Sequence, residues 1–498
     1  MKIFGTDGIR GKVGEKPIIV SIIKKIAYTF ANTIFQGKKG LIYISNDGRE
    51  SSQIIQNALF SGISHQGSKC CNVGLLSTPA MSLCLNKLNK DLIAGIQITA
   101  SHNPYHDNGM KFFNQHGFKI NNIIENTIEN DYKYLSEIPD YVDGLHKDYE
   151  IFTTMYSNII NEYIGKKIKK TSIKEDKFNI LIDCANGATS KLITSALNNN
   201  IFTVTSIFDE PDGKNINQNC GATNPNIIKD FIKSFNSIEA ISTHNKQKKI
   251  KIDLGVALDG DGDRAIFISS DGEIINGDDV LYILAKYNKE KNNIQNPVVG
   301  TVMTNHGIQS LYKKLNIKFI EAKVGDKHVV EEMIKNNSYI GGESSGHIII
   351  NDFNNLYVGD GIITMINLIS ALINIESKSD IYYYFNDSAL NGILSLSDAQ
   401  ELIDMGYILK KKIRMESISI NEFFNKYNLK NKKINFFKID LEGLDFEIIK
   451  VLDFKNLDIQ LLMIEKKLNK LENEELILYL KTKSFKRSEE HTSELQSP

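Results

Sequence analysis

The sequence predicts an α/β protein, because short β-branched runs, polar glycine turns and amphipathic helical segments follow one another in that order. The strand-like run Ile42–Ser45 precedes such a turn and a helical pattern from Ser51, and Asn179–Ile182 precedes another turn and a helical pattern from Ser190. Strand, turn and helix in succession are typical of α/β units with a largely parallel sheet. Such sheets bind ligands at the carboxyl ends of their strands, where these polar turns lie.

The α/β pattern recurs about three times along the 498 residues, in units that open near residues 1, 175 and 253. Past residue 378 glycines become scarce, and lysine-rich segments at 409–433 and 464–486 predict helices. The last eleven residues have neither periodicity nor an apolar face, and they look like a translated adapter. We therefore expect domains over 1–155, 156–252 and 253–377, an atypical α/β fragment over 378–487, and a non-native-looking tail over 488–498.

Composition excludes several classes of partner. Lys+Arg 59 against Asp+Glu 60 leaves a net charge of −1, which gives no electrostatic reason to expect nucleic acid. The N-terminus has no apolar signal region, and the most apolar stretch, 362–375, is shorter than the ~20 residues of a membrane span. The five cysteines form no C-x-x-C pair, as expected for reduced thiols. We expect a cytoplasmic protein without nucleic-acid or membrane partners, and its oligomeric state stays open.

The run Thr99–Pro104 carries a candidate nucleophile, Ser101, on a loop after an apolar strand. A lone serine in a loop is usually a turn or capping residue. A second cluster, Asp259–Arg264, changes that interpretation, because a serine beside several carboxylates and an arginine suggests phosphoryl transfer. Lys111 follows the serine loop and is either a general acid/base, a phosphate partner or a solvated lysine.

Asp259, Asp261 and Asp263 are candidate metal ligands. Carboxylates this close repel one another unless a cation or protons intervene, and the glycines between them leave the backbone free to turn their oxygens toward one point. An EF-hand is excluded, since Arg264 stands at the sixth position and Ser270 at the twelfth. A plain polar turn is the alternative to a site for a hard divalent ion such as Mg²⁺.

Two further glycine-rich runs carry weaker signals. Phe4–Gly11 contains Arg10, which such a loop would direct at a phosphate; a surface arginine is the simpler interpretation. Gly341–His347 places Glu343 and Ser345 two residues apart, on one side of an extended backbone, where they would suit sugar hydroxyls. A hydrogen-bonded turn is the alternative for this second run.

Taken together, these blocks resemble the α-D-phosphohexomutase superfamily over about the first 375 residues. The resemblance implies three similar mixed-sheet domains around a central cleft, one Mg²⁺ per chain and a small sugar phosphate as the partner. Its closest branch interconverts glucosamine 6-phosphate and glucosamine 1-phosphate through a bisphosphate; phosphomannomutase or phosphoglucomutase activity is the alternative. The blocks are Phe4–Gly11, Thr99–Lys111, Pro211–Pro225, Asp259–Arg264, Gly342–His347 and Gly359–Gly361.

The resemblance also implies a role for each candidate residue. Ser101 would be the phosphoserine, and a phosphate oxygen on it would complete the Mg²⁺ site of the three aspartates. The transferring group would lie between Arg10 and Lys111, with His102 as a further catalytic residue. The implied substrate-binding residues are Glu343, Ser345, His347 and Arg264, of which Arg264 would also support the metal loop.

Two departures from the family stand out. Lys327 and His328 replace the usual arginine and tyrosine, and the Arg-x-Ser-Gly-Thr-Glu loop of a fourth domain, which grips the non-transferring phosphate, is missing from the sequence. Residues 381–468 instead resemble part of an FkbM-type SAM-dependent methyltransferase, without its glycine-rich turn. We expect a chimera joined near 374–380, with impaired mutase activity or none. This second resemblance rests on Ile418–Phe424, Phe436–Gly443 and Leu462–Glu465.

Overall fold

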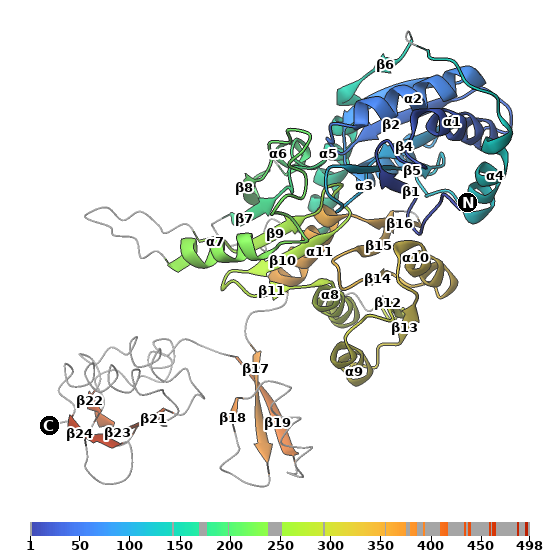
Figure 1. Cartoon of the computed structure of the whole chain (residues 1–498). Helices are drawn as coiled ribbons and strands as arrows, with labels where there is room; N and C mark the ends of the chain where they lie inside the picture. The colour runs from blue at the N-terminus through green and yellow to red at the C-terminus, as the bar shows by residue number, and fades with distance from the viewer. Residues whose placement is uncertain are drawn as a thin grey trace, which may run out of the picture. The chain divides into compact units, whose positions relative to one another are not determined.

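The chain divides into two compact units, Met1–Ile375 and Glu376–Pro498 (Figure 1). This division falls in the interval where the sequence changes character. The computed structural model describes residues 2–141, 144–168, 177–197, 199–237, 251–291, 294–353 and 355–374, together with short strands between 379 and 496.

The first domain is built on a six-stranded mixed sheet in the order β1-β5-β4-β2-β3-β6. Strand β2 is parallel to β3 and β4, whereas β5 is antiparallel to β1 and β4. The helix expected from Ser51 is α2. The elements are β1 (Ile9–Lys12), α1 (Val20–Ile34), β2 (Leu41–Asn46), α2 (Ser52–Gln66), β3 (Lys69–Leu75), α3 (Thr78–Leu88), β4 (Ile93–Ile98), β5 (Asp107–Phe113), α4 (Asn122–Asp131), the 3₁₀ turn η1 (Tyr132–Tyr134), β6 (His146–Lys147) and α5 (Tyr149–Lys167).

Apolar side chains at helical spacing fix these helices against the sheet. Ile23, Ile26 and Phe30 lie on one face of α1 and are buried in the core that α1 shares with α2, its neighbour in Figure 1. Met81 of α3 and Phe152 of α5 belong to a second core, which continues into the other two domains. Full burial of each such side chain stabilises the fold by about 1.5–3 kcal/mol.

The second domain has a five-stranded sheet in the order β11-β10-β9-β7-β8. Strand β7 is parallel to β8 and β9, and β10 is antiparallel to β9. We expected β9 and the turn of three aspartates in a third domain that starts at residue 253, but their strands pair within this second sheet. The elements are β7 (Phe178–Asp183), α6 (Leu192–Ala196), β8 (Phe202–Ile207), α7 (Asn226–Ser237), β9 (Leu254–Leu258), β10 (Ala265–Ser269) and β11 (Ile274–Ile275).

The third domain repeats the mixed arrangement in a sheet ordered β13-β12-β14-β15-β16. Strand β12 is parallel to β13 and β14, and β15 is antiparallel to β14 and β16. Three mixed sheets therefore confirm the predicted fold class. The elements are α8 (Gly277–Lys291), β12 (Val298–Thr301), α9 (His306–Lys314), β13 (Phe319–Ala322), α10 (Asp326–Lys335), β14 (Ile340–Gly342), β15 (Ile348–Phe353), β16 (Leu356–Gly359) and α11 (Gly361–Asn374).

Helix α5 joins the first domain to the third through buried hydrogen bonds. The Tyr156 hydroxyl donates to Asp360 Oδ2 at 2.9 Å, at the start of α11. About two turns further along α5, the Tyr163 hydroxyl donates to Asp352 Oδ2 on β15 at 2.7 Å. The apolar helix α11 is buried, as its sequence predicts. Among the helices described for this chain, none is long and apolar enough to cross a membrane.

The second unit, residues 376–498, is described only through short strands. Residues 409–416, expected at the start of a helix, form β19 and pair antiparallel with β17. Polar and apolar residues alternate over the end of this run, which is the period of a strand. The neighbouring strand β17 pairs with it along its length. The strands are β17 (Ser379–Phe385), β18 (Gly392–Ile393), β19 (Leu409–Glu416), β20 (Lys433–Ile434), β21 (Phe437–Ile439), β22 (Asp458–Ile459), β23 (Leu461–Ile464), β24 (Lys486–Arg487) and β25 (Glu494–Gln496).

Two buried tyrosines give a matched test of this packing. We expect Tyr156→Phe to lower the free energy of unfolding by about 1–3 kcal/mol, because it removes a buried donor from the Asp360 carboxyl. Tyr312→Phe should be neutral or stabilising, since the buried Tyr312 hydroxyl has no hydrogen-bond partner among the described residues. Urea denaturation of both variants measures the difference, and equal losses would contradict it.

Candidate active site

The loop between β4 and β5 carries Ser101 to the acidic cluster. Its hydroxyl donates to Asp259 Oδ2 at 2.7 Å, and both residues are buried. The two residues lie 158 positions apart in the sequence and come from the first and second domains. Folding therefore brings the candidate nucleophile and the candidate metal ligands to one place.

The three aspartates lie in the turn of the β9–β10 hairpin, where Leu258 pairs with Ala265. Gly262 has φ +75°, a left-handed conformation that L-residues rarely adopt. At Gly260 a Cβ atom would lie 2.7 Å from the Ser101 carbonyl oxygen. The two glycines thus permit both the sharp turn and the close approach of the serine loop.

The donor set of this turn fits a hard divalent cation. One carboxylate oxygen from each of Asp259, Asp261 and Asp263 can be chosen so that all lie within 4.8 Å of one another. Asp261 Oδ1 and Asp263 Oδ1 are buried and have no hydrogen-bond partner among the described residues. Burial, together with the neighbouring carboxylates, raises the pKa of Asp259 well above its usual value. A bound cation would relieve this repulsion.

Lys111, on β5, supplies positive charge to the same cluster. Its Nζ lies 2.8 Å from Oδ2 of Asp7, of Asp261 and of Asp263, and the side chain is buried. Burial alone would lower the pKa of Lys111, but the three carboxylates raise it well above the usual value. Lys111 is therefore a charged donor inside the site, which rules out the solvated lysine left open by the sequence.

Arg10, Arg264 and His102 are among the residues that line a cleft of about 400 Å³. The Nε atoms of Arg10 and Arg264 are buried without hydrogen-bond partners among the described residues, while Arg10 also pairs with Asp7. His102 Nδ1 lies 3.4 Å from Ser101 Oγ, and burial, assisted by both arginines, lowers its pKa to about 4. Guanidinium groups that converge on one cleft favour an anionic ligand such as a phosphate.

The turn between β14 and β15 brings two of its three expected residues to this cleft. Glu343 and His347 line it; Glu343 Oε1 accepts from the Gly325 N–H at 2.9 Å. Ser345 is half-buried and does not line the cleft as described. The Gly346 N–H donates to the Glu343 carbonyl at 3.0 Å, so this run is a tight turn. The same-side argument for Glu343 and Ser345, which needs an extended backbone, does not apply.

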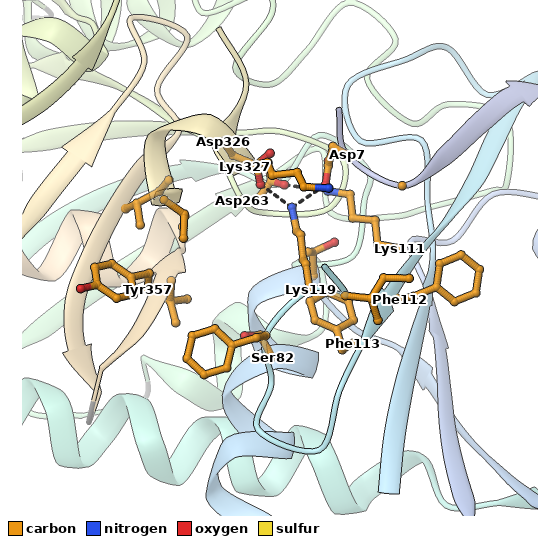
Figure 2. A pocket seen from close by; sticks show the side chains of 18 of the residues that line it. Asp7, Ser82, Lys111, Phe112, Phe113, Lys119, Asp263, Asp326, Lys327 and Tyr357 are labelled. Atoms are coloured by element: carbon orange, nitrogen blue, oxygen red, sulfur yellow. Dashed lines mark hydrogen bonds and ion pairs between the residues drawn. The ribbon is translucent and has the colours of Figure 1, made fainter. Parts of the chain in front are cut away.

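The structure adds residues that the sequence analysis did not single out. Asp7 contacts Lys111 and Lys119, and Lys119 also pairs with Asp326 of α10. Figure 2 shows these charged side chains gathered at one side of a cavity of about 250 Å³, with Phe113 and Tyr357 along its walls. Thr78 donates from its hydroxyl to Asp261 Oδ2. Asp7 lies inside the glycine-rich N-terminal run and Asp326 directly precedes Lys327 and His328, so these two had a sequence signal, whereas Lys119 and Thr78 had none.

Three family models match successive parts of the chain. Residues 1–138 match phosphoglucomutase/phosphomannomutase alpha/beta/alpha domain I, residues 158–272 match domain II, and residues 276–386 match domain III. The chain belongs to the phosphoglucomutase/phosphomannomutase family. Domain II of this family covers the turn of three aspartates, in agreement with the pairing of β9 and β7.

Relatives in this family are named phosphoglucosamine mutase. The protein of Histophilus somni (strain 129Pt) is 35% identical over 378 residues, which cover 75% of this chain and 79% of the relative. That of Dictyoglomus thermophilum is 37% identical over 383 residues, or 74% and 76% of the two chains. That of Nitrosococcus oceani is 34% identical over 440 residues, or 84% and 92%.

Solved structures of the family share the fold. A phosphoglucomutase/phosphomannomutase family protein from Burkholderia thailandensis matches with a TM-score of 0.59 and 20% identity, over 76% of this chain and 81% of that one. The open form of parafusin, a phosphoglucomutase from Paramecium, matches with a TM-score of 0.55 and 18% identity, over 80% and 78%. These likenesses support the three-domain architecture of the phosphohexomutase unit.

The balance of charge in this candidate site can be tested through Lys111. We expect Lys111→Met to destabilise the metal-free protein by about 3–5 kcal/mol at neutral pH, because it leaves buried carboxylates uncompensated. Magnesium should restore part of the loss, since a divalent cation would meet the same carboxylates. Thermal unfolding in EDTA and in magnesium measures both effects.

The control for this variant is Lys87→Met, which removes an exposed pair with Glu162. It should change the free energy of unfolding by less than about 0.5 kcal/mol. Magnesium should raise its melting temperature by less than that of Lys111→Met. Equal shifts in the two variants would contradict the assignment of charge compensation to Lys111.

Proposed function

We propose that this chain interconverts glucosamine 6-phosphate and glucosamine 1-phosphate through a phosphorylated Ser101. The observation that carries the proposal is the 2.7 Å hydrogen bond from Ser101 Oγ to Asp259 Oδ2, which is one of three clustered, buried carboxylates that lie next to a buried lysine. The choice of glucosamine rests on the names of relatives that are 34–37% identical to this chain.

The proposed reaction uses one oxygen of the chain, Ser101 Oγ. Starting from the phosphorylated state, Ser101 gives its phosphoryl group to the 1-hydroxyl of glucosamine 6-phosphate: the Oγ–phosphorus bond breaks, a bond to O1 forms, and one proton passes from the sugar to Oγ. The bisphosphate then rotates in the cleft so that its other phosphate faces Ser101. Ser101 Oγ next takes the phosphoryl group from O6: the O6–phosphorus bond breaks, the Oγ–phosphorus bond re-forms, the proton on Oγ passes to O6, and glucosamine 1-phosphate is released. Such transfer depends on positioning and charge stabilisation.

Asp259, Asp261 and Asp263, with an oxygen on Ser101, would hold one Mg²⁺. When bound, the ion supplies positive charge to the oxygens of the transferring phosphoryl group. Lys111 and Arg10 supply further positive charge beside it, and His102 lies next to the serine oxygen.

The remaining cleft residues would bind the rest of the substrate. Arg264 faces the same cleft as Arg10, where it would meet phosphate oxygens, and its backbone N–H also donates to Asp259 Oδ1 at 3.1 Å. Glu343 and His347 line the cleft as expected of sugar ligands. For Ser345 the tight turn offers no support.

Three organisational points belong to the same proposal. We propose a boundary between the first and second domains near residue 155, which falls within the continuous helix α5 (Tyr149–Lys167), and a methyltransferase-like segment in place of a fourth domain. The parts of that segment singled out by sequence, such as 418–424, lie mostly outside the described residues. A cytoplasmic location is supported by five buried, free thiols, which suit a reducing compartment.

Serine replacement tests the covalent step. Ser101→Ala should abolish uptake of a phosphoryl group from glucosamine 1,6-bisphosphate, because it removes the Oγ atom that contacts Asp259 and would carry the group. Intact-protein mass spectrometry detects the added group, and Ser310→Ala, at an exposed position on α9, is the control. Phosphate uptake by Ser101→Ala would refute the assignment.

Substrate choice is tested by steady-state turnover of glucosamine, glucose and mannose 6-phosphates. We expect kcat/KM to be highest for glucosamine 6-phosphate. A preference for glucose or mannose would move the chain to the phosphoglucomutase or phosphomannomutase alternative while leaving the serine chemistry in place.

The missing Arg-x-Ser-Gly-Thr-Glu run gives a separate prediction. Each charge-assisted hydrogen bond lost from the non-transferring phosphate costs about 1.5–3 kcal/mol, or roughly 10- to 150-fold in affinity. We therefore expect a KM for glucosamine 6-phosphate well above that of the Histophilus somni relative assayed in parallel, while Ser101 still accepts phosphate. A matching KM would contradict this expectation, and a chain that accepts no phosphate at all would support the inert alternative.

A further inference from the structure

We infer that Arg49 is a positioning residue that holds the serine loop in the shape that directs Ser101 Oγ at Asp259. Its consequence for catalysis rests on the proposed function, whereas its effect on the loop does not. Arg49 follows β2, and its side chain is fully buried. Four of its contacts are main-chain carbonyl oxygens of the serine loop, taken here as residues 99–107 so that it includes Asp107, the first residue of β5.

A guanidinium has five N–H donors, and all five of Arg49 are used. The Nε donor goes to Asp47 Oδ2 at 2.9 Å. The donors of one terminal nitrogen go to the carbonyls of Ser101 at 3.0 Å and Asn103 at 2.8 Å. Those of the other go to the carbonyls of Pro104 and, at 2.9 Å, Asp107. One planar group therefore fixes four carbonyls between residues 101 and 107.

Asp47 links the amide of Ser101 to Arg49 through a chain of hydrogen bonds. The Thr99 hydroxyl donates to Asp47 Oδ2 at 2.7 Å, and the Ser101 N–H donates to the same hydroxyl oxygen at 2.8 Å. Arg49 holds the carbonyl of Ser101 and, through Asp47 and Thr99, its amide. Both peptide groups that flank the Ser101 side chain are thus tied to one buried ion pair.

The backbone of Ser101 explains why the loop needs such support. Its φ is +52°, in the left-handed region that a serine adopts only when its surroundings enforce it. Asn217 of the second domain adds a donor to the Ser101 carbonyl at 2.9 Å, next to the aspartate turn. Without Arg49, the loop would lose four hydrogen bonds that keep this conformation, and Oγ would no longer be held at Asp259.

Arg49 could instead be a buried ion pair that serves stability alone. In that case its donors would be spread over the fold, but four of the five end on the loop that carries the nucleophile. Lysine cannot replace it, because an ammonium has three donors and no planar fork, although it preserves the charge opposite Asp47. Arg49→Lys therefore separates charge from geometry.

The test uses the full chain with Arg49→Lys and Arg49→Ala. Hydrogen exchange followed by mass spectrometry should show faster exchange for the amides of residues 99–108 in both variants. Phosphate uptake from glucosamine 1,6-bisphosphate should be slower by about 10²-fold, the effect expected of a misplaced nucleophile, with the bisphosphate concentration at half-maximal rate nearly unchanged.

The matched control is Lys24→Met. Lys24 is also a buried cation of the first domain, and its Nζ donates to the Ile138 carbonyl at 3.0 Å, outside the serine loop. It should lower the melting temperature without changing exchange at 99–108 or phosphate uptake. Wild-type exchange at the loop in Arg49→Lys, or equal slowing of uptake in Lys24→Met, would overturn the inference. Faster loop exchange in Arg49→Lys, with no phosphate uptake even by the wild type, would support the positioning role and refute the proposed function.

Discussion

The close approach of two loops is the constraint on which the rest of this site depends. The serine loop after β4 meets the aspartate turn after β9 with so little space that a Cβ at Gly260 would lie 2.7 Å from the Ser101 carbonyl oxygen. The aspartate turn also packs closely against Gly187, because a Cβ atom at Gly187 would lie 2.2 Å from the Gly260 carbonyl oxygen. Main chain packed against main chain in this way lets side chains from separate domains meet at hydrogen-bond distance.

Charge explains why that meeting is useful. Lys111 lies within 2.8 Å of three carboxylates, so a single ammonium faces several negative charges in a buried place. The pKa of Asp259 is raised, while that of Asp263, which burial alone would also raise, is held low by Lys111 and His347. A site with surplus buried carboxylate is suited to a divalent cation and, through it, to phosphate oxygens. Arg10 and Arg264, which line the cleft beside these carboxylates, favour the same anionic ligand.

The contacts that hold the serine loop in place are as specific as those that Ser101 makes within the candidate site. Arg49 and Asp47 hold the serine loop from behind, while Asn217 holds it from the second domain. Helix α5 ties the first domain to the third through Tyr156 and Tyr163. In both arrangements, buried polar groups fix the positions of loops and domains relative to one another. Phosphoryl transfer depends on such positioning more than on any single reactive side chain.

The sequence alone predicted the fold class and singled out Ser101 and the three aspartates as candidates, because alternating strands, glycine turns and clustered carboxylates are properties of neighbouring residues. Tertiary structure decided which sheet holds the aspartate turn, that the run around Ser345 is a tight turn, and that Arg49 contacts the serine loop and Thr78 contacts Asp261. These outcomes depend on contacts between residues far apart in the chain. Local sequence patterns do not predict such contacts, since the contacts form only when separate domains pack.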